Sequence, residues 1–140
     1  YDVDGQVFLC AQFEPYCFKT DIFDVPEYIY HMTPRFNKKS ILDDGIVVSW
    51  PTTPVFEYPK RVYCFTEGDR LRFKAFAQNS RQYQPNKNGI IEFTVFEIES
   101  RKTECMFFSG PNMPDAIYTY DDIPVSAFNR VIDDSVKSVI

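Results

Sequence analysis

Hydrophobic residues occur along this chain in short runs, which polar or proline-containing stretches separate. Most runs are rich in β-branched or aromatic residues, which are typical of strands. No run approaches the roughly 20 apolar residues that a membrane-spanning helix needs, so no membrane partner is expected. The runs predict strands over residues 5–13, 16–21, 28–32, 46–50, 70–77, 90–98 and 103–108.

The clearest alternation lies in residues 70–77, where basic and apolar residues follow each other as Arg-Leu-Arg-Phe-Lys-Ala. Period-two alternation predicts a half-buried strand, here with a basic outer face. We expect a hairpin of 70–77 with 90–98 to supply the fourth and fifth strands of the sheet. The polar stretches 33–40 and 79–89 predict loops.

The last twenty residues show a different pattern. Asp121 or Asp122 offers a helix N-cap, and Pro124 suits a first helical turn. The following apolar residues recur at helical spacing, at Val125, Phe128, Val131, Ile132, Val136 and Val139. This spacing predicts an amphipathic C-terminal helix. Such a helix would either pack on the sheet or bind another chain.

These elements favour an all-β fold, namely a small five-stranded OB-type barrel with a C-terminal α-helix. The cysteine and tryptophan spacing of an immunoglobulin-like domain is missing. We expect the barrel over residues 1–110 and a C-terminal extension over 111–140 that carries the helix. In one alternative, residues 33–66 are an insertion in a barrel loop.

Length and charge narrow the picture. The chain has 140 residues, enough for one domain, and a formal net charge of −5. Residues 60–90 nevertheless carry seven basic residues and only two acidic ones. A basic segment of this kind is typical of a polyanion-binding surface, although it also occurs as a solvated face that balances acidic neighbours.

Four cysteines are widely spaced along the chain, at positions 10, 17, 64 and 105. No C-x-x-C pair suggests zinc or thiol redox chemistry, so we expect neither a metal nor a cofactor. The spacing favours free thiols and an intracellular setting, cytoplasmic or nuclear. Two disulfides in a secreted domain are the alternative.

The first 31 residues resemble the cold-shock domain, a family of OB-type barrels. The residues that carry the resemblance are Gly-Gln-Val-Phe-Leu-Cys at 5–10, Pro-Tyr-Cys-Phe at 15–18 and Glu-Tyr-Ile-Tyr-His at 27–31. The approach to the family's fourth strand is similar to residues 67–73 and also to Leu-Asp-Asp-Gly at 42–45. We prefer 67–73. Leu9, Cys10 and Ile29 stand where the family has aromatic residues.

The resemblance implies a non-catalytic module that binds single-stranded nucleic acid, RNA rather than DNA. Such modules stack bases on aromatic rings and hold phosphates with a cationic rim. By motif position, the stacking residues would be Tyr16, Phe18 and His31. The phosphate contacts would be Arg70, Arg72, Lys74, Arg81 and Lys87.

A second hypothesis is a barrel that has lost nucleic-acid binding and serves as a protein-interaction module in a larger assembly. The acidic total and the altered aromatic positions favour it. The partner-binding residues would then be the apolar residues of the C-terminal helix, Phe128, Val131, Ile132 and Val136.

Catalysis finds little support in the sequence. His31 is the single histidine, and no nucleophile elbow, P-loop or dinucleotide-binding motif is present. The adjacent acid pairs at 43–44, 121–122 and 133–134 would point apart on a strand or helix rather than converge. We therefore expect no catalytic residues.

Overall fold

The computed structural model of the protein describes residues 18–19, 25–48, 61–109 and 115–139. Its strands are β1 (Phe18–Lys19), β2 (Tyr28–Pro34), β3 (Val62–Phe65), β4 (Ile90–Glu99), β5 (Phe108–Ser109), β6 (Ala116–Thr119) and β7 (Phe128–Lys137). Its helices are α2 (Lys38–Asp44) and α3 (Arg70–Asn79), with short 3-10 turns η1 (Arg35–Asn37), η2 (Ser100–Lys102) and η3 (Val125–Ala127).

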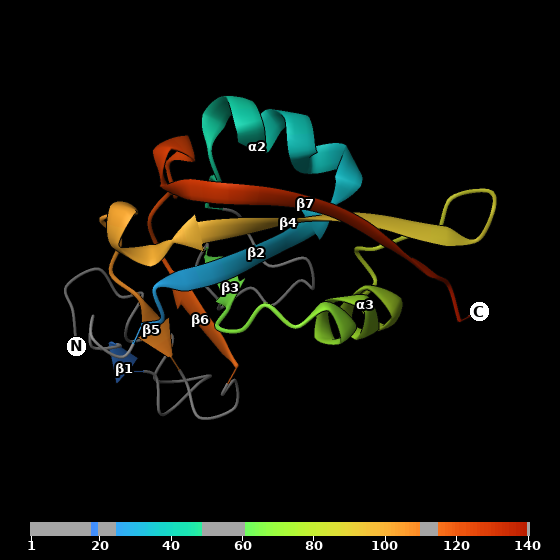
Figure 1. Ribbon diagram of the computed structural model, residues 1–140, viewed down its shortest axis with the longest axis horizontal. Coiled ribbons are helices and arrows are strands. Elements are labelled where there is room, and N and C mark those ends of the chain that lie inside the picture. Colours follow the sequence, from blue (N-terminus) through green and yellow to red (C-terminus); the bar gives the residue numbers. More distant parts are fainter. Residues whose placement is uncertain (1–17, 20–24, 49–60, 110–114, 140) are drawn as a thin grey trace.

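Within the described residues, the seven strands form one antiparallel sheet in the order β1-β5-β6-β3-β2-β4-β7. The prediction of a mostly β fold is therefore confirmed. Strands β2, β4 and β7 run side by side, and β7 is the outermost of the three (Figure 1). No pairing joins β1 to β7 in the part of the chain that the structure describes, so the described sheet has two ends.

Strand β4 lies between β2 and β7 and is buried on both faces. Phe96 and Ile98 point to one face, and Phe93 and Val95 to the other, and all four are at most 1% exposed. A strand that is apolar on both faces must be covered on both sides, because its side chains alternate. Two hydrophobic clusters accordingly form, one on each face of the sheet.

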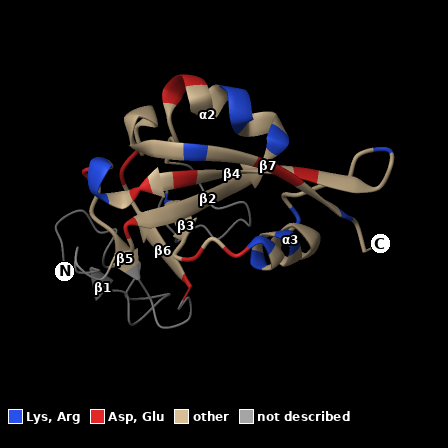
Figure 2. Cartoon of the chain, in the orientation of Figure 1, with Lys and Arg blue, Asp and Glu red and all other residues tan. Residues whose placement is uncertain are grey.

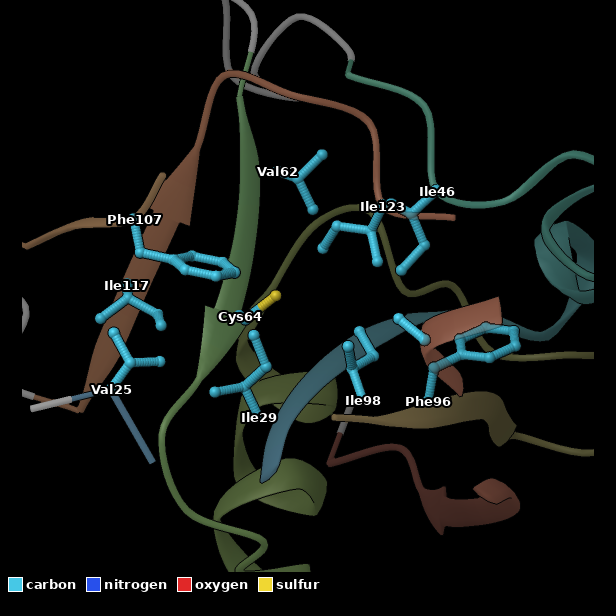
Figure 3. Packing of buried hydrophobic residues seen from close by; sticks show 11 residues of the cluster. Val25, Ile29, Ile46, Val62, Cys64, Phe96, Ile98, Phe107, Ile117 and Ile123 are labelled. Carbon is cyan, nitrogen blue, oxygen red and sulfur yellow. The ribbon is translucent and has the colours of Figure 1, made fainter. Parts of the chain in front are cut away.

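The first cluster fills the face that carries Phe96. Side chains from β2, β3, β4 and β6 converge there on Cys64, as Figure 3 shows. The connecting segments close its rim, because Ile46 and Ile123 form an isolated β-bridge and both are buried. The buried members are Val25, Ile29, Ile46, Val62, Cys64, Phe96, Ile98, Phe107, Ile117, Ile123 and Ala127.

The second cluster lies on the opposite face, and α3 covers it. Phe73 and Ala77, one helical turn apart, are the buried residues of α3. They pack with Met32, Ile91, Phe93, Val95 and Tyr83. The spacing of Phe73 and Ala77 is that of a helix face directed at the sheet.

The prediction of a strand over residues 70–77 is wrong, because these residues form α3. Asp69 caps the helix: its carboxylate accepts hydrogen bonds from the backbone nitrogens of Leu71 and Arg72 at 3.0 and 3.4 Å. In the helix Leu71 is 76% exposed although a strand would have buried it. The expected hairpin of 70–77 with 90–98 is therefore also wrong, since β4 pairs with β2 and β7 instead.

The predicted C-terminal helix is not present either, because residues 128–137 form β7. This ten-residue strand pairs with β4 from Ile98↔Phe128 to Ile90↔Lys137. Its apolar residues are mostly β-branched and contribute to both hydrophobic clusters. Because both faces of β7 are half-buried, apolar and polar residues do not alternate along it. The spacing of its apolar residues instead matches that of an amphipathic helix.

Other expectations have mixed outcomes. The strands predicted over 28–32 and 90–98 are confirmed as β2 and β4. The loop predicted over 33–40 contains η1 and the start of α2, and the strand predicted over 103–108 is reduced to the two residues of β5. The strand predicted over 5–13 lies outside the described residues, as do parts of those over 16–21 and 46–50. Within the expected extension 111–140, β6 and β7 pair with β3 and β4.

We predict that Phe96→Ala lowers the free energy of unfolding by about 3–5 kcal/mol, because it leaves a cavity in a fully buried position. Phe36→Ala is the matched control. Phe36 is 80% exposed, so its loss should change the free energy by less than about 0.5 kcal/mol. Urea denaturation measures both, and equal effects of the two substitutions would contradict the described core.

Candidate interaction surface on strand β7

The five predicted phosphate-binding residues are spread over α3 and the connection that follows it. Arg70 donates from Nε to the Asp134 carboxylate at 2.8 Å, and Arg72 donates from Nε to that of Asp115 at 2.8 Å. Among the described residues, no ion pair forms at Lys74, Arg81 or Lys87. Two of the five cations are thus already neutralised within the fold.

The structure does not bring the predicted stacking residues together with the predicted phosphate-binding residues. Tyr16 and the side chain of Phe18 lie outside the described residues. His31 lies on β2 opposite Phe96, on the face of the first cluster. Because α3 covers the other face, the sheet separates His31 from Arg70.

His31 has a structural contact instead. Its Nδ1 lies 2.8 Å from the backbone oxygen of Tyr63, at the point where the ladder between β2 and β3 is reduced to one registered pair, Tyr30↔Phe65. A carbonyl oxygen only accepts, so Nδ1 carries the hydrogen. Burial lowers the pKa of His31 despite this hydrogen bond, so the ring is neutral at pH 7 and Nε2 holds its lone pair.

An arginine–tyrosine cluster on β3 and β6 was not predicted from the sequence. The Arg61 guanidinium lies 4.2 Å from the ring centroid of Tyr118 and donates to the hydroxyl of Tyr63 at 2.8 Å. The available signal was the aromatic residues at alternate positions, Tyr63 with Phe65 and Tyr118 with Tyr120. Because Arg61 is 3% exposed and Tyr118 is fully buried, this cluster stabilises the sheet rather than presenting rings to a ligand.

The four residues expected to bind a partner lie on β7 rather than on a helix. Phe128 and Val131 pack against the first cluster, and the Phe128 ring lies 4.9 Å from that of Phe96. Ile132 and Val136 pack against the second cluster. The four side chains therefore occupy two faces of the strand and form no single apolar surface.

Strand β7 also carries two adjacent aspartates whose carboxylates form hydrogen bonds on opposite faces of the sheet. Asp133 accepts from Lys38 Nζ at 2.7 Å and from the Thr94 hydroxyl at 2.9 Å, whereas Asp134 accepts from Arg70. Hydrogen bonding from Lys38 lowers the pKa of Asp133, and that from Arg70 lowers the pKa of Asp134. The expectation that these two carboxylates point apart is confirmed.

Asp134 is also the point where two arginines from different elements contact β7. Arg35 donates from Nη2 to the backbone oxygen of Asp134 at 2.7 Å, while Arg70 binds its carboxylate from the other face. The next residues in sequence are Phe36, 80% exposed, and Leu71, 76% exposed. These are the most exposed large hydrophobic residues in the described part of the chain.

A β-bulge shapes the other end of the strand. The register between β4 and β7 shifts between Glu97 and Ile98, which leaves Asn129 without a registered partner on β4. Asn129 and Arg130 both donate to the Glu97 carboxylate, at 2.7 and 3.1 Å. Burial raises the pKa of Glu97, but hydrogen bonds from Asn129, Arg130 and Tyr30 outweigh this effect, and the pKa is lowered overall. Glu97 therefore stays ionised and holds Arg130 beside the strand.

The remaining chemical features of the described residues are few. Among the described residues, no group of three or more histidine, cysteine or acidic side chains could hold a metal ion. Cys64 and Cys105 are free thiols, whereas Cys10 and Cys17 lie outside the described residues. Over the same residues, no helix combines the length and the apolar character that crossing a bilayer requires. Basic and acidic positions both occur on α2 and on β7 in the view of Figure 2.

Comparisons with known proteins do not assign the chain to a family. No family model matches the sequence, and no curated protein matches it significantly. The function must therefore be argued from the surface itself.

We predict that His31→Asn makes the stability less dependent on pH. Asparagine keeps an amide hydrogen for the Tyr63 oxygen but does not titrate. Because the folded state lowers the pKa of His31 below its ordinary 6.5, the unfolded state binds the proton more readily. The neutral ring therefore contributes fully to the free energy of unfolding above about pH 6.5, and this contribution is lost as the pH falls below that value.

Urea denaturation at pH 7.5 and pH 5.0 tests this prediction. The difference in free energy of unfolding between the wild type and His31→Asn should shrink at pH 5.0. A difference that is the same at both pH values would show that burial of His31 does not disfavour its protonation.

Proposed function

We propose that this chain is a non-catalytic protein-interaction module that binds an extended segment of a partner by strand addition to β7. One observation carries the proposal. A ten-residue strand ends the described sheet, and Arg35 and Arg70, which directly precede the two most exposed apolar residues in sequence, both bind Asp134 on that strand.

The physical basis is the outer side of β7, which pairs with no other strand among the described residues, although the Ser135 amide there donates to the Asp134 carboxylate. Its N–H and C=O groups can form main-chain hydrogen bonds with an added strand, and flanking side chains select the partner's residues. Charged residues at Arg130, Asp133 and Asp134 limit indiscriminate pairing of such an edge. Phe36 and Leu71 then supply the apolar contact that a correct partner would cover.

The proposal keeps an OB-type, cold-shock-like barrel as the finer description of the fold. The antiparallel pairing and the strong β character support it. An intracellular setting, cytoplasmic or nuclear, is part of the same proposal, and the thiols of Cys64 and Cys105 support it.

Single-stranded RNA or DNA is the second candidate ligand. The observation in its favour is that Lys74, Arg81 and Lys87, which lie on α3 and the connection after it, form no ion pair with any described residue. Cations that form no close ion pair can bind phosphates, and such binding weakens steeply as salt rises.

A displayed library of random peptides tests the main proposal with the full chain. We expect selected peptides to bind the wild type and to lose at least tenfold in affinity for the double variant Phe36→Ser/Leu71→Ser, because each substitution removes an exposed apolar contact. Met106→Ser is the matched control, since Met106 is also exposed but lies outside β7, η1 and α3. A library that yields no binder, or binders indifferent to the double variant, would contradict the proposal.

Fluorescence anisotropy with labelled RNA and DNA oligomers separates the two candidates. We expect no binding at physiological salt, because Asp134 and Asp115 already neutralise Arg70 and Arg72. Salt-sensitive binding that disappears in Lys74→Glu/Arg81→Glu/Lys87→Glu, but persists in Lys38→Glu/Lys39→Glu/Lys102→Glu, would favour nucleic acid instead.

A further inference from the structure

We propose that the partner of β7 is a second copy of this chain, whose β7 pairs antiparallel with the first about a two-fold axis at Ile132. This inference rests on the proposed strand addition and names its partner. Symmetric pairs of one surface are the commonest form of homodimer, and they require that surface to be self-complementary. The sequence of β7 meets that requirement in one register.

The sheet geometry restricts the registers that are available. Directly opposed residues of an antiparallel pair point to the same face, and residues on one strand alternate between the faces. In a continuous sheet with the two-fold axis perpendicular to it, one residue of each strand must therefore face its own copy. The central residues of β7 available for this position are Arg130, Val131, Ile132, Asp133 and Asp134.

Charge selects among these five registers. A centre at Arg130 opposes two arginines, and centres at Asp133 or Asp134 oppose two aspartates, each of which is unfavourable. A centre at Val131 places Phe128 opposite Asp134. Beyond these five, a centre at Ser135 places Asp133 opposite Lys137, but it pairs only residues 133–137 of β7. A centre at Ile132 pairs residues 128–136, opposes an apolar residue to itself and places Arg130 opposite Asp134 on both sides of the axis.

The two charged residues are held ready for this contact. Glu97 accepts from Arg130 at 3.1 Å, yet the Arg130 side chain is 62% exposed. The Asp134 side chain is 16% exposed and accepts from Arg70 and from the Ser135 backbone nitrogen, and one of the roughly four acceptor positions of a carboxylate is left for a second arginine. Pairing about Ile132 would join Glu97, Arg130 and the partner's Asp134 in one alternating network.

The backbone directions along β7 fit the same register. Ser138 donates its backbone N–H to the Gly89 oxygen across the extended β4–β7 ladder, and these directions alternate along a strand, so the N–H and C=O groups of Val131 and Asp133 point away from β4. With the axis at Ile132, Val131 of each copy would lie opposite Asp133 of the other, and these outward-facing groups would form the main-chain hydrogen bonds.

Disulfide trapping tests the register with the full chain. We expect Ile132→Cys to form a 132–132 disulfide between two copies under mild oxidation, because Cα atoms of opposed antiparallel residues lie about 4.5–5.5 Å apart, within disulfide reach. Ser135→Cys is the matched control. In this register the two residues 135 lie roughly 20 Å apart and should not cross-link to each other. Peptide mass spectrometry distinguishes these bonds from those of the native cysteines.

Sedimentation equilibrium provides a measurement that needs no introduced cysteine. We expect the wild type to form a reversible dimer. The affinity of dimerisation should fall at least tenfold in Arg130→Ala, and circular dichroism spectra check that this variant is folded. The wild type is measured at its highest soluble concentration and after 100–200-fold dilution from it. A protein that is monomeric at both concentrations would overturn the inference. A disulfide through Val131→Cys in place of Ile132→Cys would overturn it also.

The two proposals fail in different ways. A monomer that binds library peptides in a manner dependent on Phe36 and Leu71 contradicts self-pairing and leaves strand addition standing. A monomer that binds no peptide contradicts both. A dimer that is indifferent to Arg130→Ala and cross-links at neither position uses another surface and also contradicts self-pairing.

Discussion

The burial of β4 on both faces is the constraint on which the rest of the structure depends. Phe93 and Val95 on one side and Phe96 and Ile98 on the other exclude water from both faces of one strand. Such a strand cannot lie at the end of a sheet or leave a face uncovered. The positions of β2 and β7 beside it, of α3 over one face, and of the Ile46–Ile123 bridge over the other follow from this requirement.

The placement of β7 gives the edge its properties. Its apolar residues belong to the two clusters. Its charged residues therefore face solvent or form ion pairs with the helices. Asp133 and Asp134 connect the strand to α2 on one face and to α3 on the other, through Lys38 and Arg70. Arg35 of η1 also binds this segment, through the Asp134 backbone oxygen. Stability and recognition thus share one short segment of chain.

The sequence predicted the elements whose local pattern had one explanation. Residues 90–98 are all β-branched or aromatic except Glu92 and Glu97, a composition typical of a strand. Residues 70–77 fit both a strand and a helix, and Asp69 as an N-cap was the signal that separates the two. Residues 128–137 could not be assigned locally, because their environment depends on β4, some forty residues earlier. The predicted site depended on which face each residue occupies, so the error at α3 moved the basic residues away from His31.

The single registered pair between β2 and β3 divides the sheet into two mechanical units. One contains β3, β6, β5 and β1, and the other contains β2, β4 and β7. Tyr30↔Phe65 and the His31 imidazole bridge them, and both hydrophobic clusters draw on the two units, the second through Phe65 of β3 and Met32 of β2. Hydrophobic cohesion yields gradually under shear, whereas a hydrogen-bonded ladder breaks in steps. Pulled apart in an optical trap, the chain would first separate along this boundary, and each unit would extend afterwards as a body of its own.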